Sequence, residues 1–257
     1  MAKWTAFPYA GDYRFDAASV KKKWSRLHAG DLEPLPQDPE LMQAWVHFHN
    51  GDFQKAATLG QSLGTFGACV ASKATCIYAT YLEKHETRRL DLFLEVADRA
   101  GDIAGKDPSH LNARYWRAYA LGRYSQGISV AKALAQGLGT KVKTDLEYVI
   151  RHAPQHADAH VALGSFHAEV IDKVGSLIGA MAYGANKDIG LHLFEQALTL
   201  HKESSYGLLE YAHAMLMLGG EDMMSEANQL YLRAAQTKPQ DAAERLDVEM
   251  AKAQLAD

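Results

Sequence analysis

Apolar and polar residues recur along this chain with the period of an α-helix from about residue 40 to the end. No stretch alternates apolar and polar residues as a half-buried strand would. The helical segments are separated by short breaks, most of which contain Gly, Pro, Asn or Asp, residues that interrupt helices. The breaks fall at residues 50–52, 64, 101, 107–108, 137–140, 153–154, 202–205, 219–220 and 238–239. This pattern predicts helical hairpins in series.

The N-terminal segment has a different pattern, with aromatic residues spaced among small and polar ones. These residues are Trp4, Phe7, Tyr9, Tyr13 and Phe15. They predict an extended arm, and because exposed aromatics favour aggregation we expect it to dock on the protein's own groove or on a neighbouring subunit. Asp16 is predicted to cap a helix over residues 17–29, and residues 31–39, with three prolines, to form a stiff connector. The predicted domains are therefore residues 1–39 and a helical repeat domain over residues 40–257.

Three of the breaks have one form, in which an apolar helix is followed by a proline and a few polar residues. Pro108 and Pro154 are 46 residues apart, the matching Lys202 follows after 48, and Pro239 after a further 37. Such a recurrence indicates repeats. Against a basic unit of about 34 residues, the first two intervals are long. They predict insertions at about residues 125–139 and 170–185.

The residues of the later units resemble the tetratricopeptide repeat (TPR) family. His160-Val-Ala-Leu163-Gly164-Ser-Phe-His167 is similar to the first helix of that repeat, with His at both aromatic positions. Ala227-x3-Tyr231-x2-Ala234, followed by Pro239, is similar to the second helix. The resemblance implies an all-α, TPR-like right-handed helical solenoid with two lengthened helical hairpins. Residues 241–255 are expected to form the C-terminal capping helix that such stacks need.

The resemblance also implies a concave groove lined by the first helix of each unit. Alignment places these residues there: Leu41, Trp45, Tyr115, Tyr119, Val161, Ser165, Leu209 and His213. This aromatic and apolar set suits a helix or an extended peptide. It lacks the Lys and Asn of carboxylate-clamp repeats that bind chaperone tails. The first hypothesis is therefore a non-catalytic scaffold for protein–protein interaction.

The two insertions are rich in Gly and Ala, and we expect each to lengthen its helix by three to four turns. Gly175 and Gly179 are four residues apart and would share one helix face. The insertions could pack on each other, form an interface between copies of the chain, or hold a small apolar ligand, which is the second functional hypothesis. The residues singled out for the last two roles are Ile128, Leu134, Gly175, Ile178, Gly179 and Tyr183.

The paired insertions also resemble two remoter groups, the T components of TRAP-type transporters and the regulator-of-microtubule-dynamics proteins. The T components resemble this layout in having helices that enclose an apolar channel. They are periplasmic lipoproteins, whereas the start of this chain shows no lipoprotein signal or anchoring cysteine. Their transport role is therefore not carried over.

Charge and cysteine content narrow the function classes. The chain has 27 Lys and Arg against 31 Asp and Glu, so no basic excess predicts nucleic-acid binding. The longest weakly polar stretch, residues 174–185, is shorter than the roughly 20 residues that span a bilayer. Cys69 and Cys76 would lie roughly 10 Å apart on one helix, too far for a disulfide. Reduced thiols and the absence of a signal pattern predict a cytoplasmic protein.

Residues capable of catalysis or metal binding do not form a convincing group. His156, His160 and His167 share part of a helix face, but two of them occupy positions that hold packed aromatics in the repeat. Residues 137–141 lack the spacing of a phosphate-binding loop. Lys21, Lys22 and Lys23 are interpreted as a solvated helix face. We therefore predict no enzyme activity, no metal and no cofactor.

Overall fold

The computed structural model describes residues 3–256, and these residues contain fourteen α-helices, one 3-10 helix and no β-strand. The predicted all-α class is confirmed. By their contacts the described residues form two compact units. The first comprises residues 3–28, 32–129 and 241–243, and the second residues 29–31, 130–240 and 244–256. The predicted domain boundary after residue 39 lies inside the first unit.

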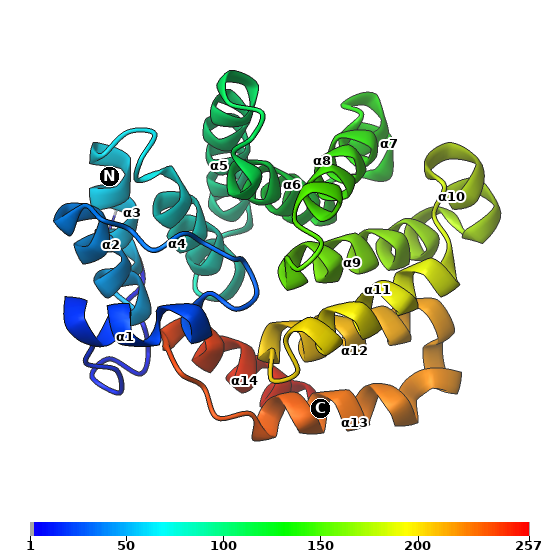
Figure 1. Cartoon of the computed structure of the whole chain (residues 1–257). Coiled ribbons are helices and arrows are strands. Elements are labelled where there is room, and N and C mark those ends of the chain that lie inside the picture. The colour runs from blue at the N-terminus through cyan, green and yellow to red at the C-terminus, as the bar shows by residue number, and fades with distance from the viewer. Residues whose placement is uncertain (1–2, 257) are drawn as a thin grey trace. The chain divides into compact units, whose positions relative to one another are not determined.

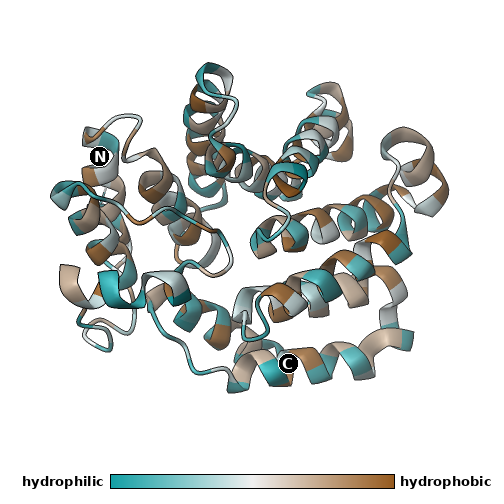
Figure 2. Ribbon diagram, viewed as in Figure 1, coloured by the Kyte–Doolittle hydropathy of each residue, from teal (hydrophilic) through white to brown (hydrophobic). Residues whose placement is uncertain are grey.

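The first unit is a succession of helices in which α2, α3, α4 and α5 each pack on the next helix (Figure 1). The helices are α1 Ala17–Leu27, α2 Pro39–His49, α3 Phe53–Ser62, α4 Ala68–Tyr81, α5 Glu86–Lys106 and α6 Leu111–Gln126. Brown and teal residues alternate along these helices in Figure 2, as amphipathic packing requires.

Two aspartates explain where the first two helices begin. The Asp16 side chain accepts a hydrogen bond from the Ser19 backbone N–H, and the Ser19 hydroxyl oxygen accepts one from the Asp16 backbone N–H, which forms a capping box. Asp38 accepts from the backbone N–H groups of Glu40 and Leu41, both at 2.9 Å. Pro39 then occupies the first helical turn, where its missing N–H costs nothing. Hydrogen bonds between residues close in sequence therefore set the start of both helices.

The second unit contains the remaining helices. They are α7 Val130–Ala135, α8 Leu138–His152, α9 Ala157–Val174, α10 Ser176–Tyr183, α11 Lys187–Leu200, α12 Ser205–Gly219, η1 Gly220–Met223, α13 Met224–Gln236 and α14 Ala242–Gln254, whose first two residues belong to the first unit. Helix α9 packs on α8, α11 and α12, and α12 packs on α13. The proline-containing breaks fall between α5 and α6, between α8 and α9, and between α13 and α14, as the repeat pattern predicts.

The repeat period is visible in three helix caps. His110 and His156 each follow a proline by two residues, and the Nδ1 of each accepts a hydrogen bond from the backbone N–H three residues on. Ser204 caps α12 in the same way by accepting from Gly207. These caps recur at the intervals read from Pro108, Pro154 and Lys202. A histidine can hold a cap position because its ring nitrogen satisfies one of the N–H groups that a helix start leaves unpaired.

The insertions form separate short helices, so the prediction that they lengthen existing helices is wrong. Gly137, Gly175 and Gly184 all have positive φ, at 62°, 81° and 64°, which a continuing right-handed helix cannot accept. The second insertion therefore continues α9 only as far as Val174 and then forms α10, a distinct helix beyond the end of α9 in Figure 1. Gly175 is the N-cap of α10, so Gly175 and Gly179 do not share the face of one helix interior.

The core of the second unit explains the small and large residues of the repeat pattern. A Cβ added at Gly164 would lie 2.7 Å from the Phe194 ring, so glycine permits the close approach of α9 and α11. Phe194 is fully buried and stacks on Tyr211, with ring centroids 4.9 Å apart. Ala197, Tyr231 and Ala234 complete the same core. This is the packing that the TPR resemblance implies.

Candidate binding surface under the N-terminal arm

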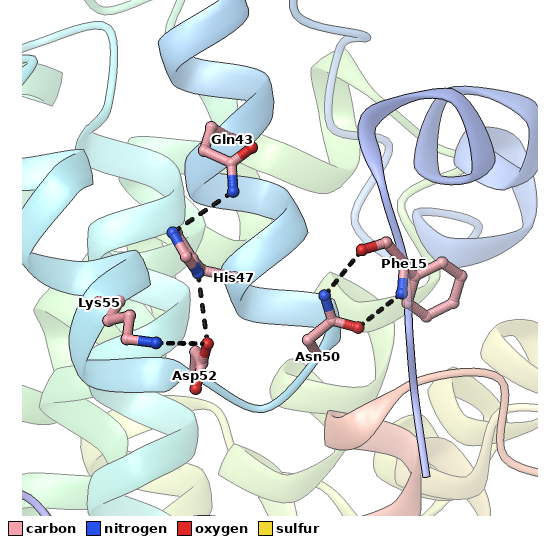
Figure 3. Close-up of polar contacts among 6 residues, drawn as sticks. All are labelled: Phe15, Gln43, His47, Asn50, Asp52 and Lys55. Carbon is pink, nitrogen blue, oxygen red and sulfur yellow. Dashed lines mark hydrogen bonds and ion pairs between the residues drawn. The ribbon is translucent and has the colours of Figure 1, made fainter. Parts of the chain in front are cut away.

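The turn between α2 and α3 is the structural base of the site. Its Gly51 has φ of 86°, and the backbone N–H of Asp52 closes the turn on the His47 carbonyl at 2.9 Å. Side chains brace the turn from outside: the Asp52 carboxylate lies 3.4 Å from His47 Nδ1 and accepts from Lys55 Nζ at 3.0 Å (Figure 3). The turn is therefore fixed by residues of both helices that it joins.

Asn50 in this turn holds the C-terminal end of the arm. Its side-chain oxygen accepts from the backbone N–H of Phe15 at 2.7 Å, and its amide donates to the Phe15 carbonyl at 3.0 Å (Figure 3). One side chain thus satisfies both backbone groups of one residue, as a neighbouring strand would. This clamp recognises extended backbone and makes no demand on the side chain at position 15.

Trp4 is the first of two aromatic anchors of the arm. Its ring stacks on Tyr78 of α4 with centroids 4.1 Å apart and an interplanar angle of 12°. Its backbone N–H donates to the Gln54 side chain of α3 at 3.1 Å. Only 8% of Trp4 is exposed. Burial of one large aromatic side chain contributes about 1.5–3 kcal/mol, so this contact is a substantial part of what holds the arm.

The Tyr78 hydroxyl forms a hydrogen bond with the backbone of the residue that follows Trp4. It accepts from the Thr5 N–H at 3.3 Å and donates to the Glu83 carboxylate at 2.9 Å. Burial and the hydrogen bond to Glu83 raise the pKa of Tyr78 above its ordinary value. Burial works to raise the pKa of Glu83 as well, but hydrogen bonds from His85 and Tyr78 and the charge of Arg88 outweigh it and lower that pKa. At neutral pH a neutral Tyr78 therefore stays oriented by an ionised Glu83.

Phe7 is the second anchor. It packs edge-on against Phe53 of α3, with centroids 6.0 Å apart, and is 5% exposed. Its ring also covers Gly51 so closely that a Cβ there would lie 2.5 Å from Phe7 Cδ1. The positive φ and the ring contact both require glycine at this position.

These contacts define what we call the arm surface, which consists of Asn50, Gly51, Phe53, Gln54 and Tyr78. It offers two aromatic contact sites and three side chains that bond to backbone groups. Such a surface can bind an extended segment through its main chain and select two of its side chains. The arm thus docks on its own chain, at residues that were not among those predicted to line the groove.

The residues predicted to line the groove lie mainly in the interior of the units. Trp45 packs among Trp24, His28 and Phe48. Trp45, Tyr115, Tyr119, Val161 and Leu209 are all buried, and His213 of the set is half-buried beside Tyr231. As a partner-binding groove, this set stays a prediction.

The residues predicted for an apolar pocket or interface are more dispersed. Ile128 is half-buried in the first unit, whereas Leu134, Gly175 and Ile178 are exposed in the second. Gly179 is buried against Val170 and Ala185. The Tyr183 ring covers Gly139, and its carbonyl accepts from Lys143 Nζ at 2.9 Å. Helix α10 instead presents an apolar outer side, formed by Leu177, Ile178 and Met181 at 59–81% exposure.

The histidines near α9 have structural partners. His160 Nε2 lies 3.0 Å from the Pro154 carbonyl, and His167 Nδ1 accepts from the Asn186 N–H at 3.2 Å. Within residues 3–256 no group of three or more His, Cys, Asp and Glu side chains is placed to hold a metal ion. Cys69 and Cys76 are buried, and neither forms a disulfide within the described residues. In the same part of the chain, no helix is both long and apolar enough to cross a membrane.

Sequence reasoning missed Asn50, Gln54 and Tyr78. Asn50 was visible only as part of a turn signal, and Gln54 and Tyr78 are ordinary residues of amphipathic helices. Their role arises because the fold brings the arm beside them, across 35, 50 and 73 residues of sequence. The one signal in the sequence was the arm itself, whose aromatic side chains need a partner surface.

Comparison with known proteins supports the class of fold. The structure is similar to the crystal structure of a thermophilic TPR protein from Thermus thermophilus, with a TM-score of 0.58 and 18% sequence identity. The match covers 83% of this chain and 97% of that one. No protein-family model matches the sequence, and neither does any curated protein. The chain therefore has an all-helical repeat fold of the TPR type, as the sequence resemblance implied.

Proposed function

We propose that this protein is a non-catalytic scaffold that binds protein partners. The observation that carries the proposal is the arm surface, where the chain holds an extended segment by two aromatic anchors and by side-chain bonds to its backbone. Helical repeat scaffolds of this class use their surfaces to bind other proteins. The predicted groove residues Trp45, Tyr115, Tyr119, Val161, Leu209 and His213 belong to this proposal as the apolar frame of the scaffold.

Affinity capture with cross-linking tests this function. The intact protein and the Phe66→Asp variant, which alters an 85% exposed phenylalanine, are used as bait in lysate of the source organism. We expect at least one protein to be retained in stoichiometric amount by both, with cross-links to defined positions of the chain. Retention of background proteins alone, without reproducible cross-links, would count against a scaffold function.

The alternative proposal is a small apolar ligand held at the inserted helices. It is supported by the apolar outer side of α10, formed by Leu177, Ile178 and Met181. Native mass spectrometry on untagged protein would then show a mass above the bare chain of 28.3 kDa that is released on denaturation. The Met181→Glu variant should lose that mass and Phe66→Glu should retain it. A bare chain in all three samples would remove this alternative for tightly bound ligands.

A further inference from the structure

The arm surface shows which side-chain pattern it selects. Trp4 and Phe7 are three residues apart, and both are buried, while Thr5, Ala6 and Pro8 between and beside them are exposed. Two contact sites therefore select aromatic side chains, the Thr5 side chain adds a hydrogen bond to Tyr78, and the position of Ala6 is free to vary. The first site is a flat tyrosine face that suits stacking, and the second is an edge-on phenylalanine contact over a glycine.

The surface also reads the main chain at defined positions. Gln54 accepts from the N–H of the first aromatic residue, and Tyr78 accepts from the N–H of the residue that follows it. A bound segment must therefore have free N–H groups at both positions, which excludes proline there. Gln54, Tyr78 and Phe53, which meet the anchors and the backbone beside them, are uncharged, so their recognition rests on aromatic contact and neutral hydrogen bonds.

We propose that the arm surface is the docking site for a segment of a partner protein with the pattern aromatic-x-x-aromatic, and that the chain's own arm occupies this site until the partner displaces it. The inference rests on the proposed scaffold function and names the kind of partner. The arm itself, seated on the surface, provides the chemical template for the segment.

A partner segment is a better occupant than the arm of a second copy. An exchanged arm would make the same contacts as the arm in place, while association of two chains loses translational and rotational freedom. A tethered arm acts at an effective concentration of about millimolar. A foreign segment therefore displaces the arm only with stronger contacts, with more of them, or at a concentration above that effective value. The arm raises the apparent dissociation constant of the segment by the reciprocal of the fraction of time that the site is uncovered.

The turn in the arm is suited to release. Residues Pro8 to Asp12 form a turn in which the Asp12 N–H donates to the Tyr9 carbonyl at 3.2 Å. Gly11 in this turn has φ of 95° and nothing within 4 Å of an added Cβ. The Asn50 clamp on Phe15 lies on the far side of this turn. The part of the arm with Trp4 and Phe7 can therefore leave while Phe15 stays bound.

Isothermal titration calorimetry with a synthetic peptide of residues 3–10 tests the proposal. The receptors are the full-length protein and its Trp4→Ala/Phe7→Ala variant, whose arm lacks both anchors. We expect the variant to bind the peptide at least about tenfold more tightly, because the tethered competitor is lost. Equal binding by the two receptors, or none by the variant, would overturn the proposal.

Matched peptides test the pattern. A peptide with Ala at both anchor positions should not bind, and one with Thr5→Pro should lose at least about tenfold in affinity because the N–H to Tyr78 is gone. Ala6→Ser is the control and should bind as the parent does, because that side chain is exposed. Equal affinity of all these peptides for the protein would show nonspecific binding, and it would contradict a site that selects the pattern aromatic-x-x-aromatic.

Two further checks keep the outcome clear. Circular dichroism establishes that the double variant keeps its helices, and the single Trp4→Ala variant, which retains Phe7, replaces it if it does not. A wild-type dimer that dissociates in the variant would assign the surface to a second copy and overturn the partner proposal. If the peptide fails to bind but captured proteins cross-link elsewhere on the chain, this inference is wrong and the scaffold function stands.

Discussion

Gly51 couples the turn between α2 and α3 to the arm. Any other residue would be strained at φ of 86°, at a cost of about 1–2 kcal/mol, and its Cβ would collide with Phe7. Gly51→Ala should therefore lower the free energy of unfolding by more than Gly64→Ala, by about 1 kcal/mol or more from overpacking. Gly64 is the matched control, since its φ is 61° and nothing lies within 4 Å.

Urea denaturation followed by tryptophan fluorescence measures both variants. The Gly51 variant should also lose the contacts of Phe7 with the turn, whereas the Gly64 variant should keep its arm in place. Equal destabilisation by the two substitutions would mean that the arm does not press on the turn.

His167 makes stability depend on pH. Burial, with a smaller effect from the charge of Lys143, lowers the pKa of His167 to about 4. In the unfolded chain the ring protonates near its ordinary pKa of about 6.5, so the unfolded state binds more protons between these values. The contribution, about 3 kcal/mol, is present in full above pH 6.5 and is lost as the pH falls toward 4.

The His167→Asn variant isolates this effect because Asn keeps an acceptor for the Asn186 N–H without titrating in this range. Denaturation midpoints from pH 7 to 4.5 should fall more steeply for the parent than for the variant. Parallel curves would show that His167 does not carry the pH dependence.

At the scale of single residues, the sequence indicated which side chains pack in the core but not which side chains bind the arm. His160 and His167 were predicted to be structural from their repeat positions, and both have backbone partners. Asn50, Gln54 and Tyr78 could not be chosen, because a polar residue on a helix is informative only when its neighbour in space is known.

The helices α9 and α11 provide a prediction at the scale of elements. Gly164 and Gly122 both lie inside helices, where Gly costs about 1 kcal/mol relative to Ala. Gly164→Ala would place a Cβ against the buried Phe194 ring and destabilise by about 1–3 kcal/mol. Gly122→Ala meets nothing within 4 Å and should stabilise by about 0.5–1 kcal/mol.

Chemical denaturation of both variants checks the signs of these two changes. Opposite signs would establish close packing of α9 on α11 as the reason for the repeat glycine. A stabilising Gly164→Ala would contradict that packing.

Element boundaries were predictable where local chemistry sets them. Asp16, Asp38 and the prolines at 108, 154 and 239 mark starts and breaks that the structure keeps. The insertions were mispredicted because the helical period continues through them. Gly175 and Gly184 take positive φ instead of continuing a helix. Which of the two a glycine does depends on tertiary contacts, and the periodicity of the sequence does not reveal these contacts.

For the whole molecule, the neutral character of the arm surface predicts weak salt dependence. Gln54, Phe53, Gly51 and Tyr78, which meet the two anchors, are uncharged. The ionised Glu83 behind Tyr78 is paired with Arg88 at 3.0 Å, and surface charges farther away are screened within about 10 Å at 0.1 M salt. Peptide affinity for the Trp4→Ala/Phe7→Ala protein should therefore change by less than about twofold between 50 and 500 mM salt. A steep loss with salt would assign binding to the exposed Lys21, Lys22 and Lys23 instead.

The repeat class was predictable for the whole chain because the helical periodicity and the positions of small residues are visible in the sequence itself. The sequence predicted that the arm needs a partner surface but not where that surface lies. The surface is assembled from the α2–α3 turn, α3 and α4, which are separated in sequence from the arm. The arm surface is also the basis for the proposed partner, a segment with the pattern aromatic-x-x-aromatic.

Amide hydrogen exchange on the intact, unmodified protein tests the central claim most directly. Without added peptide, the N–H groups of Trp4 and Thr5 should exchange slowly because Gln54 and Tyr78 accept them. Excess peptide of residues 3–10 should speed their exchange while the amides of α3 and α4 remain protected. Fast exchange of Trp4 and Thr5 in the free protein, or no change on adding the peptide, would contradict a displaceable arm on a segment-binding surface.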